Sequence, residues 1–436
     1  MKWEKYNKSI FLILPFLLIG FCTSDIQRNI IINQYDDIEN NIVDSTVYSS
    51  LSIDVKKFGA KGNGIKDDWE PIQSSLNKVR AHGGGTVFLP DGKYVVSRAL
   101  RIYKNTRLKL SKNSTIVRNH NGTLIINGEI NGEYTGYKGE GNILIEGGTF
   151  LMNTTSNPKP GSAFGIARAD GVLIRNIKVL NIINSHAIDL NSSKNVVIEN
   201  SHFLGFKDNT TDKSRTYSEA IQIANHTRRG FRTLGVYDGT PCINVTVYNC
   251  IFGSNDIEGF GAWGVGVGNH GLGVVELFNQ NIKIIKNFFN GLSYSGIHFN
   301  NFNQVEISEN TFDNCNHTII IDTLSNTLTP EGSLSNIIQS GENVLISNNI
   351  FRNTIKENIE ISGYSNEKSL VRVNSIKIIK NDFLQKNHKM AYEFSNININ
   401  LGTKIIIEEN HFIGTKNIHL INSRKFEIRN NLVSKF

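Results

Sequence analysis

Cysteine is scarce in this chain: four cysteines stand among 436 residues. If the first of them, Cys22, belongs to an export segment, three remain, and an odd number leaves at least one thiol unpaired. A disulfide framework therefore does not hold this fold. We expect Cys250 and Cys315 to pack inward as small apolar groups.

Other features are missing as well. The net charge of +7 is spread along the chain without a block of lysine and arginine, which argues against a nucleic-acid partner. No dense aspartate cluster demands calcium, so we expect no metal and no cofactor. Low-complexity stretches are absent too, and 39% hydrophobic and 19% charged residues are typical of a globular protein.

The N-terminal residues have the layout of export and attachment segments. Three lysines before residue 10 precede an apolar run over 10–21, which is too short for an ordinary membrane span. The sequence predicts a signal peptide over 1–22, a tether over 23–50 and a location outside the cytoplasm. Cys22 follows the apolar run and resembles a bacterial lipoprotein attachment site, so a lipid anchor in the membrane at Cys22 and ordinary cleavage nearby both stay open.

A nine-residue segment returns eight times along the chain. Each copy has apolar residues at alternate positions, then an Asn, Gly or charged turn, then a closing Phe; the closing residues are Phe150, Phe203, Phe252, Phe289, Phe312, Phe351, Phe383 and Phe412. Such a repeat indicates a solenoid, and its alternating Val and Ile indicate strands. Stacking buries the apolar faces and aligns Asn residues into ladders. The sequence predicts an all-β fold, a single-stranded right-handed parallel β-helix over 51–436.

Residues 53–96 predict an N-terminal cap on the β-helix. The order is a strand, a glycine turn, an amphipathic helix and another strand. Asp67 and Glu70 have the spacing of a capping box, and Gly83 to Gly85 stop the helix. Such an element covers the apolar end of the first coil.

The segment FGAKGNGIKDDWEPIQSSLNKVRAHGGGTVFLPDGKYVV, residues 58–96, resembles the N-terminal module of the pectate lyase superfamily. That group includes polygalacturonase-like, rhamnogalacturonase-like and epimerase-like β-helices, and cap and coils together cover nearly all of the mature chain. The resemblance implies a carbohydrate ligand. It leaves the reaction open, because hydrolases, lyases, epimerases and phage adhesins share the scaffold.

A second set of strands lies between the repeats and predicts the site. Alternation places Asp189, Gln222, Gly266 and His298 in one outward column, with His186 and Glu219 aligned at the starts of their strands. Rungs lie about 4.8 Å apart, so neighbouring carboxylates fall about 5 to 10 Å from each other, a separation used in glycoside hydrolysis. We predict Asp189 and Glu219 as the catalytic pair. The small residues Ala187, Ala220, Gly264 and Gly266 are expected to leave room for a sugar ring.

The segment Gly264–Gly271 is similar to the Gly-His-Gly turn of polygalacturonase-like enzymes, which implies a catalytic or subsite role for His270. The Asn-Thr-Asp and Asp-Asp motifs of those enzymes are replaced here, by Ser185–Ala187 and by a segment containing Gln222. The resemblance in mechanism is therefore partial.

Two loops, 206–215 and 225–241, carry most of the remaining candidates. Their cations suit an acidic sugar such as a uronate. The predicted substrate-binding residues are His186, Gln222, Arg215, Arg228, Asp238 and His298.

The favoured hypothesis is an exported glycoside hydrolase that acts on an acidic polysaccharide. A lyase or an epimerase that abstracts a proton from a uronate stays open, with His186, His270, Tyr217 or an arginine as base, Gln222 as neutraliser of the carboxylate, and calcium possible for a lyase. A non-catalytic carbohydrate-binding or adhesion protein is the third reading.

Overall fold

The computed structural model describes residues 50–154, 158–231, 233–255, 257–269, 273–384, 394–414 and 416–435. The chain divides into units 1–41 and 42–436, and all described residues belong to the second. The predicted signal peptide, the tether up to residue 49, Cys22 and His270 lie outside the described residues. Within them, no helix is long and apolar enough to cross a bilayer.

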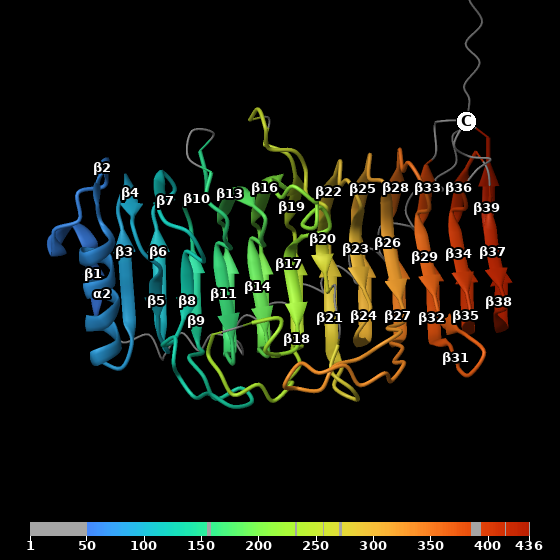
Figure 1. The fold of residues 1–436 in the computed structure, drawn as a ribbon. Coiled ribbons are helices and arrows are strands. Elements are labelled where there is room, and N and C mark those ends of the chain that lie inside the picture. The colour runs from blue at the N-terminus through green and yellow to red at the C-terminus, as the bar shows by residue number, and fades with distance from the viewer. Residues whose placement is uncertain are drawn as a thin grey trace, which may run out of the picture. The chain divides into compact units, whose positions relative to one another are not determined.

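Three long parallel sheets form the described unit, and the strands of each coil lie side by side with those of the next (Figure 1). Sheet A runs in the order β1 (Ser52–Asp54), β3 (Gly85–Leu89), β6 (Thr106–Leu110), β9 (Ile143–Glu146), β12 (Asp170–Arg175), β15 (Lys194–Glu199), β18 (Ile243–Tyr248), β21 (Asn279–Ile285), β24 (Phe302–Ser308), β27 (Glu342–Ser347), β32 (Val373–Ile379), β35 (Gly402–Glu408) and β38 (Arg424–Arg429).

Sheet B contains the strands with the closing Phe residues. Its order is β2 (Asn63–Asp67), β4 (Gly92–Val96), β7 (Ser114–Arg118), β10 (Thr149–Leu151), β13 (Lys178–Ile183), β16 (His202–Lys207), β19 (Ile251–Gly253), β22 (Phe288–Asn290), β25 (Thr311–Asp313), β28 (Ile350–Arg352), β33 (Asp382–Leu384), β36 (His411–Ile413) and β39 (Leu432–Ser434).

Sheet C contains the second set of strands. Its order is β5 (Leu100–Ile102), β8 (Ile125–Asn127), β11 (Phe164–Ala167), β14 (Ile188–Asn191), β17 (Glu219–Ala224), β20 (Val265–Gly268), β23 (Ser295–Phe299), β26 (His317–Asp322), β29 (Ile359–Ser362), β34 (Ile397–Asn400) and β37 (Ile418–Ile421). A short antiparallel pair, β30 (Tyr364–Ser365) and β31 (Leu370–Val371), projects after β29. The predicted right-handed parallel β-helix is confirmed.

A stack of phenylalanine rings fills the core beside sheet B. From Phe203 to Phe412, seven rings follow one another with centroids 4.7 to 5.3 Å apart and nearly parallel planes. The sequence repeat did not detect one coil, in which Val179 of β13 takes the place of the closing Phe. Val179 pairs with Phe150 of the coil before and with Phe203 of the coil after. The closing residue need only be apolar, so a search for Phe alone misses that rung.

A buried asparagine ladder runs along the turn between sheets A and B. Each side-chain amide donates to the side-chain oxygen of the next rung at 2.9 to 3.0 Å, through Asn287, Asn310, Asn349, Asn381, Asn410 and Asn431. The same oxygens accept from backbone N–H groups. The ladder satisfies polar groups that the turn would otherwise bury without partners.

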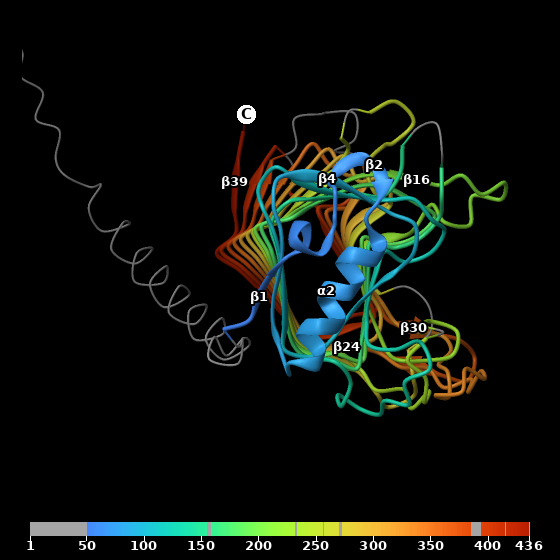
Figure 2. The ribbon, with the colours of Figure 1, turned by 90° about the vertical axis from the view of Figure 1, so that its left-hand side faces the viewer.

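Helix α2 (Trp69–Ala81) lies across the end of the first coils, as Figure 2 shows, after a short 3-10 helix η1 (Val55–Phe58). It buries Ile72, Leu76 and Val79 against the core. The helix stops as predicted, with Gly83 in the left-handed region at φ 85°. Its start differs from the predicted capping box: the N-cap is Asp68, whose carboxylate accepts instead from the backbone N–H groups of Lys61 and Gly62.

The three cysteines of the described residues are buried and unpaired, as expected. Burial raises the pKa of the Cys242, Cys250 and Cys315 thiols to about 12. They behave as small apolar residues of the core and are poor nucleophiles.

Candidate functional site

A polar cleft of about 470 Å³ opens on the outer face of sheet C. Asp189 of β14 and Gln222 of β17 are cross-strand neighbours on its floor. The loop before β17 contributes Arg215, and the loop after it contributes Thr227 and Arg229. The structure therefore brings both predicted loops to one cleft, from opposite ends of the same strand.

The outward column continues from Asp189 and Gln222 through Gly268 to His298. The prediction of Gly266 in this column is wrong. Strand β20 pairs Val265 with Glu219 and Val267 with Ile221, which shifts the alignment by two residues. Gly266 faces the core instead, where an added Cβ would lie 2.5 Å from a ring carbon of Phe289.

The small residues near the column serve the core and not a sugar ring. Ala187 and Ala220 are fully buried in the hydrophobic cluster, beside Ile188 and Ile221, which are buried too. Two successive residues face inward because the chain turns a corner between sheets B and C, so strict alternation fails there. Gly264 allows close approach to the backbone oxygen of Thr216.

Glu219 and His186 lie side by side, as predicted, but only His186 reaches the cleft. Glu219 is 0% exposed, and one of its carboxylate oxygens lies 3.5 Å from His186 Nδ1. The same Nδ1 is 2.9 Å from the Glu219 carbonyl oxygen, so it carries the hydrogen and donates. This tautomer leaves Nε2 as an acceptor, 3.4 Å from Arg215 Nη2.

Asp189 is the one carboxylate among the described residues that line the cleft. It is half-buried, and the amide of Asn191 donates to its Oδ1 at 2.7 Å. Amides are the commonest other lining groups: Gln222, Asn225, Asn269, Asn279, Asn300 and Asn301. The cleft therefore offers guanidinium donors in excess over acidic acceptors. The side-chain amides of four of its residues already donate within the protein: Asn225, Asn269, Asn279 and Asn301.

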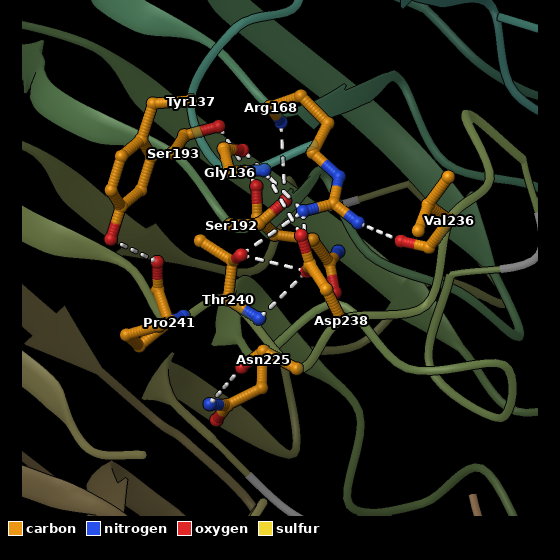
Figure 3. Close-up of polar contacts among 12 residues, drawn as sticks. Gly136, Tyr137, Arg168, Ser192, Ser193, Asn225, Val236, Asp238, Thr240 and Pro241 are labelled. Atoms are coloured by element: carbon orange, nitrogen blue, oxygen red, sulfur yellow. Dashed lines mark hydrogen bonds and ion pairs between the residues drawn. The ribbon is translucent and has the colours of Figure 1, made fainter. Parts of the chain in front are cut away.

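Asp238 lies in the outer wall of the cleft region and not on its lining. Its carboxylate pairs with Arg168 Nη1 at 2.6 Å and accepts from the N–H and hydroxyl of Thr240 and from the N–H of Gly136 (Figure 3). Although burial acts to raise it, these hydrogen bonds hold the pKa of Asp238 down at about 2. The carboxylate is thus fully engaged in holding loop 225–241 against the loop that carries Gly136.

Arg168 is the centre of that wall and was missed by sequence reasoning. Its side chain is 0% exposed, and its guanidinium also donates to the Val236 carbonyl oxygen (Figure 3). A lone arginine at the end of a strand gives no sequence signal. The asparagines of the cleft, which were also not predicted, do have a sequence signal. Each of three follows directly after a strand of sheet C: Asn225, Asn269 and Asn300.

The remaining predicted residues lie elsewhere. Arg228 borders a second hollow with Tyr237 and Glu331, and Arg229 lines both this hollow and the cleft. His298 shares the face of sheet C but does not line the cleft, and its Nε2 lies 2.8 Å from Asp322 Oδ2. The predicted roles of these residues stay predictions, as does that of His270.

His226 is a buried residue of loop 225–241, and its ring stacks on Tyr237 with centroids 5.7 Å apart. Burial, with a smaller contribution from Arg168, lowers the pKa of His226 from 6.5 to about 4. As pH falls below 6.5, His226 binds a proton in the unfolded chain but stays neutral in the folded chain. The contribution of neutral His226 to the free energy of unfolding is therefore fully present above pH 6.5. It is lost progressively as the pH falls to about 4, by up to about 3 kcal/mol.

We expect a His226→Phe variant to lose much less stability than the wild type between about pH 7 and pH 4.5. Urea unfolding at several pH values measures the slope. His419→Phe, at an exposed position of β37, is the matched control and should keep the wild-type slope. Equal slopes for wild type and His226→Phe would contradict the expectation.

A single chain wound into three parallel sheets, with a polar cleft on the outer face of one of them, defines a right-handed parallel β-helix protein. Residues 52–259 match the family model described as "Rhamnogalacturonase A/epimerase, pectate lyase-like". Over these residues, a little under half of the chain, the sequence is similar to that family.

Two similar proteins, an adhesin and an enzyme, illustrate the range of proteins with this fold. The chain is 30% identical over 299 residues to plasmin and fibronectin-binding protein A of Streptococcus pneumoniae, covering 64% of this chain and 41% of that protein. It therefore spans less than half the length of this curated relative. The crystal structure of PfbA, a surface adhesin of Streptococcus pneumoniae, has a TM-score of 0.74 and 25% identity, with 88% of this chain and 90% of that one covered.

The exopolygalacturonase of Thermotoga maritima shares the fold alone. Its TM-score is 0.58 at 14% identity, with 89% of this chain and 92% of that chain covered. Enzymes and an adhesin thus share this scaffold, and the reaction, if any, depends on the residues in the cleft.

Proposed function

We propose that this protein acts outside the cytoplasm or on the cell surface and binds an acidic polysaccharide in the cleft on sheet C. The observation that carries the proposal is the composition of the cleft: Arg215 and Arg229 face a lining of amides with Asp189 as the one described carboxylate. Guanidinium groups bind carboxylates in a fork, and amides bind sugar hydroxyls. The similarity to a surface adhesin supports the location.

Turnover of the bound polysaccharide is the second candidate, and the arrangement of His186 favours proton abstraction. Its Nδ1 donates to the Glu219 carbonyl oxygen, with the buried carboxylate close by, and its Nε2 accepts beside Arg215 at the cleft. An imidazole oriented in this way is a suitable general base, and a neighbouring guanidinium stabilises the uronate carboxylate as charge develops. Lyase and epimerase reactions both begin with this step.

Glycoside hydrolysis stays a prediction that needs a second acid. Asp189 is placed to serve as one carboxylate, whereas Glu219 is covered by His186 and absent from the cleft lining. Hydrolysis requires either movement that uncovers Glu219 or a carboxylate supplied from beyond the described residues.

Binding and turnover can be tested together on the mature protein. We expect polygalacturonate or alginate to bind in a salt-dependent manner and a neutral glucan to bind at least about ten-fold more weakly. Arg215→Gln and Arg229→Gln should each weaken binding to the acidic polymers by about ten-fold. Lys377→Gln, an exposed cation of sheet A, is the control and should bind normally.

Reducing ends and the ultraviolet absorbance of a new double bond are recorded in the same samples. Absorbance that disappears in His186→Gln supports a lyase, and reducing ends without absorbance that disappear in Asp189→Asn support hydrolysis. Binding with neither signal and with an unchanged uronate composition of the recovered polymer supports a polysaccharide adhesin, whereas a changed uronate composition supports an epimerase. Equal binding by wild type and both arginine variants, or no binding to any acidic polymer, would overturn the proposed site and leave protein adhesion as the better reading.

A further inference from the structure

Beyond the cleft, three metal-binding side chains meet on neighbouring rungs of sheet C. His317 opens β26, Glu360 lies in β29 on the next rung, and Glu357 lies in the turn just before β29. Glu360 continues the outward column of Gln222, Gly268, His298 and Ile320. The group therefore lies on the same face as the cleft, four rungs or about 19 Å beyond Gln222, and belongs to a separate site.

The Nδ1 atom of His317 makes no hydrogen bond to either carboxylate, and the spacing of the three groups suits a shared ion. Nδ1 of His317 lies 3.4 Å from Oε2 of Glu357 and 3.5 Å from Oε2 of Glu360. The three ligand atoms all lie within 4.8 Å of one another. Two atoms that each lie about 2.0 to 2.2 Å from one zinc ion, at a tetrahedral angle, are about 3.3 to 3.5 Å apart.

His317 provides an independent observation. The residue is 9% exposed, and its Nδ1 is buried without a hydrogen-bond partner. A buried polar atom usually finds a partner, since leaving one unpaired costs about 1 to 3 kcal/mol. Here the nitrogen faces two carboxylates that accept but cannot donate when ionised. A cation among the three groups would satisfy all of them.

We propose that His317, Glu357 and Glu360 bind one divalent transition-metal ion of the zinc class. One imidazole nitrogen with carboxylate oxygens is a ligand set that zinc uses, while calcium prefers six to eight oxygens. Three protein ligands leave a coordination position open for water or another oxygen donor. His298 and Asp322, paired with each other on the neighbouring rungs, are placed to orient such a donor.

The test is calorimetric titration of the full mature chain, stripped with a chelator, with zinc chloride and in parallel with manganese and calcium chloride. We expect one zinc ion per chain, calcium at least about 100-fold weaker, and a zinc-dependent rise in Tm. Glu357→Gln and Glu360→Gln conserve shape and should each weaken zinc binding at least about ten-fold. His317→Gln should abolish the stoichiometric site.

A matched control distinguishes this site from surface binding. His411 Nδ1 lies 3.4 Å from Asp382 Oδ1 on sheet B, a histidine with one carboxylate in place of two. His411→Gln should leave zinc binding unchanged. Anomalous scattering from a zinc-soaked crystal gives the position without any substitution. Zinc found elsewhere, tighter binding of calcium than of zinc, or equal binding by wild type and the glutamine variants would overturn the proposal.

Discussion

An Arg168→Met chain is expected to bind acidic polysaccharide at least about ten-fold more weakly than the wild type, although Arg168 does not line the cleft. The guanidinium holds Asp238 and the Val236 carbonyl oxygen of loop 225–241. That loop also carries Arg229, which does line the cleft. Methionine fills the volume but leaves the carboxylate of Asp238 without its charged partner in a partly buried place.

Removing one member of a buried ion pair costs about 3 to 5 kcal/mol, and less here because Asp238 is 28% exposed. That amount is enough to open a loop without unfolding the coils. We therefore expect faster cleavage within 225–241 by a protease and an unchanged β-sheet circular dichroism spectrum.

Arg107→Met is the control for a lost ion pair away from the cleft, since Arg107 pairs with Glu146 on sheet A. Its polysaccharide affinity should equal that of the wild type. If Arg168→Met accelerates cleavage of the loop yet binds normally, the loop does not shape the cleft and this explanation fails.

Truncation of one ring in the phenylalanine stack should have the largest effect on stability. Phe312 is fully buried, with ring centroids of its neighbours Phe289 and Phe351 at 4.8 and 5.2 Å. Phe312→Ala is expected to lower the free energy of unfolding by about 3 to 5 kcal/mol. The cavity cannot close easily, because both neighbouring rungs are fixed by backbone pairing and by the asparagine ladder.

Phe288→Ala is the matched control, because Phe288 is only half-buried and points away from the stack. It should cost no more than about 1 kcal/mol. Urea unfolding monitored by circular dichroism compares the two variants. Equal losses for both would show that the stack is not the main source of stability in these coils.

The sequence alone determined the architecture. Eight copies of one pattern carry the apolar alternation, the turn and the closing Phe, and every copy acts through contacts with its own neighbouring rungs. Local chemistry and global fold therefore agree, and the asparagine ladder followed from the same repetition. The cap was readable for the same reason, since a helix between two strands and a glycine stop are local signals.

The sequence also selected the region of the cleft but could not decide which side chains face it. His186, Asp189 and Gln222 were named from strand alignment and Arg215 from its loop, and all four line one cleft. Gly266 was misplaced because β20 pairs two residues out of the expected register. Glu219 proved to be covered by His186, near the corner between sheets B and C where two successive residues face inward. A period of two is a property of straight strands and does not extend through a corner.

Only the tertiary structure decided the contacts between segments that lie far apart in the chain. Arg168 meets Asp238 across 70 residues, and His317 meets Glu357 across one whole coil. Loop lengths vary from coil to coil and follow no repeat, so the position of a loop residue depends on packing that no local pattern encodes. The repeating strands specify the scaffold, and the irregular loops, placed by buried ion pairs and hydrogen bonds, specify the site.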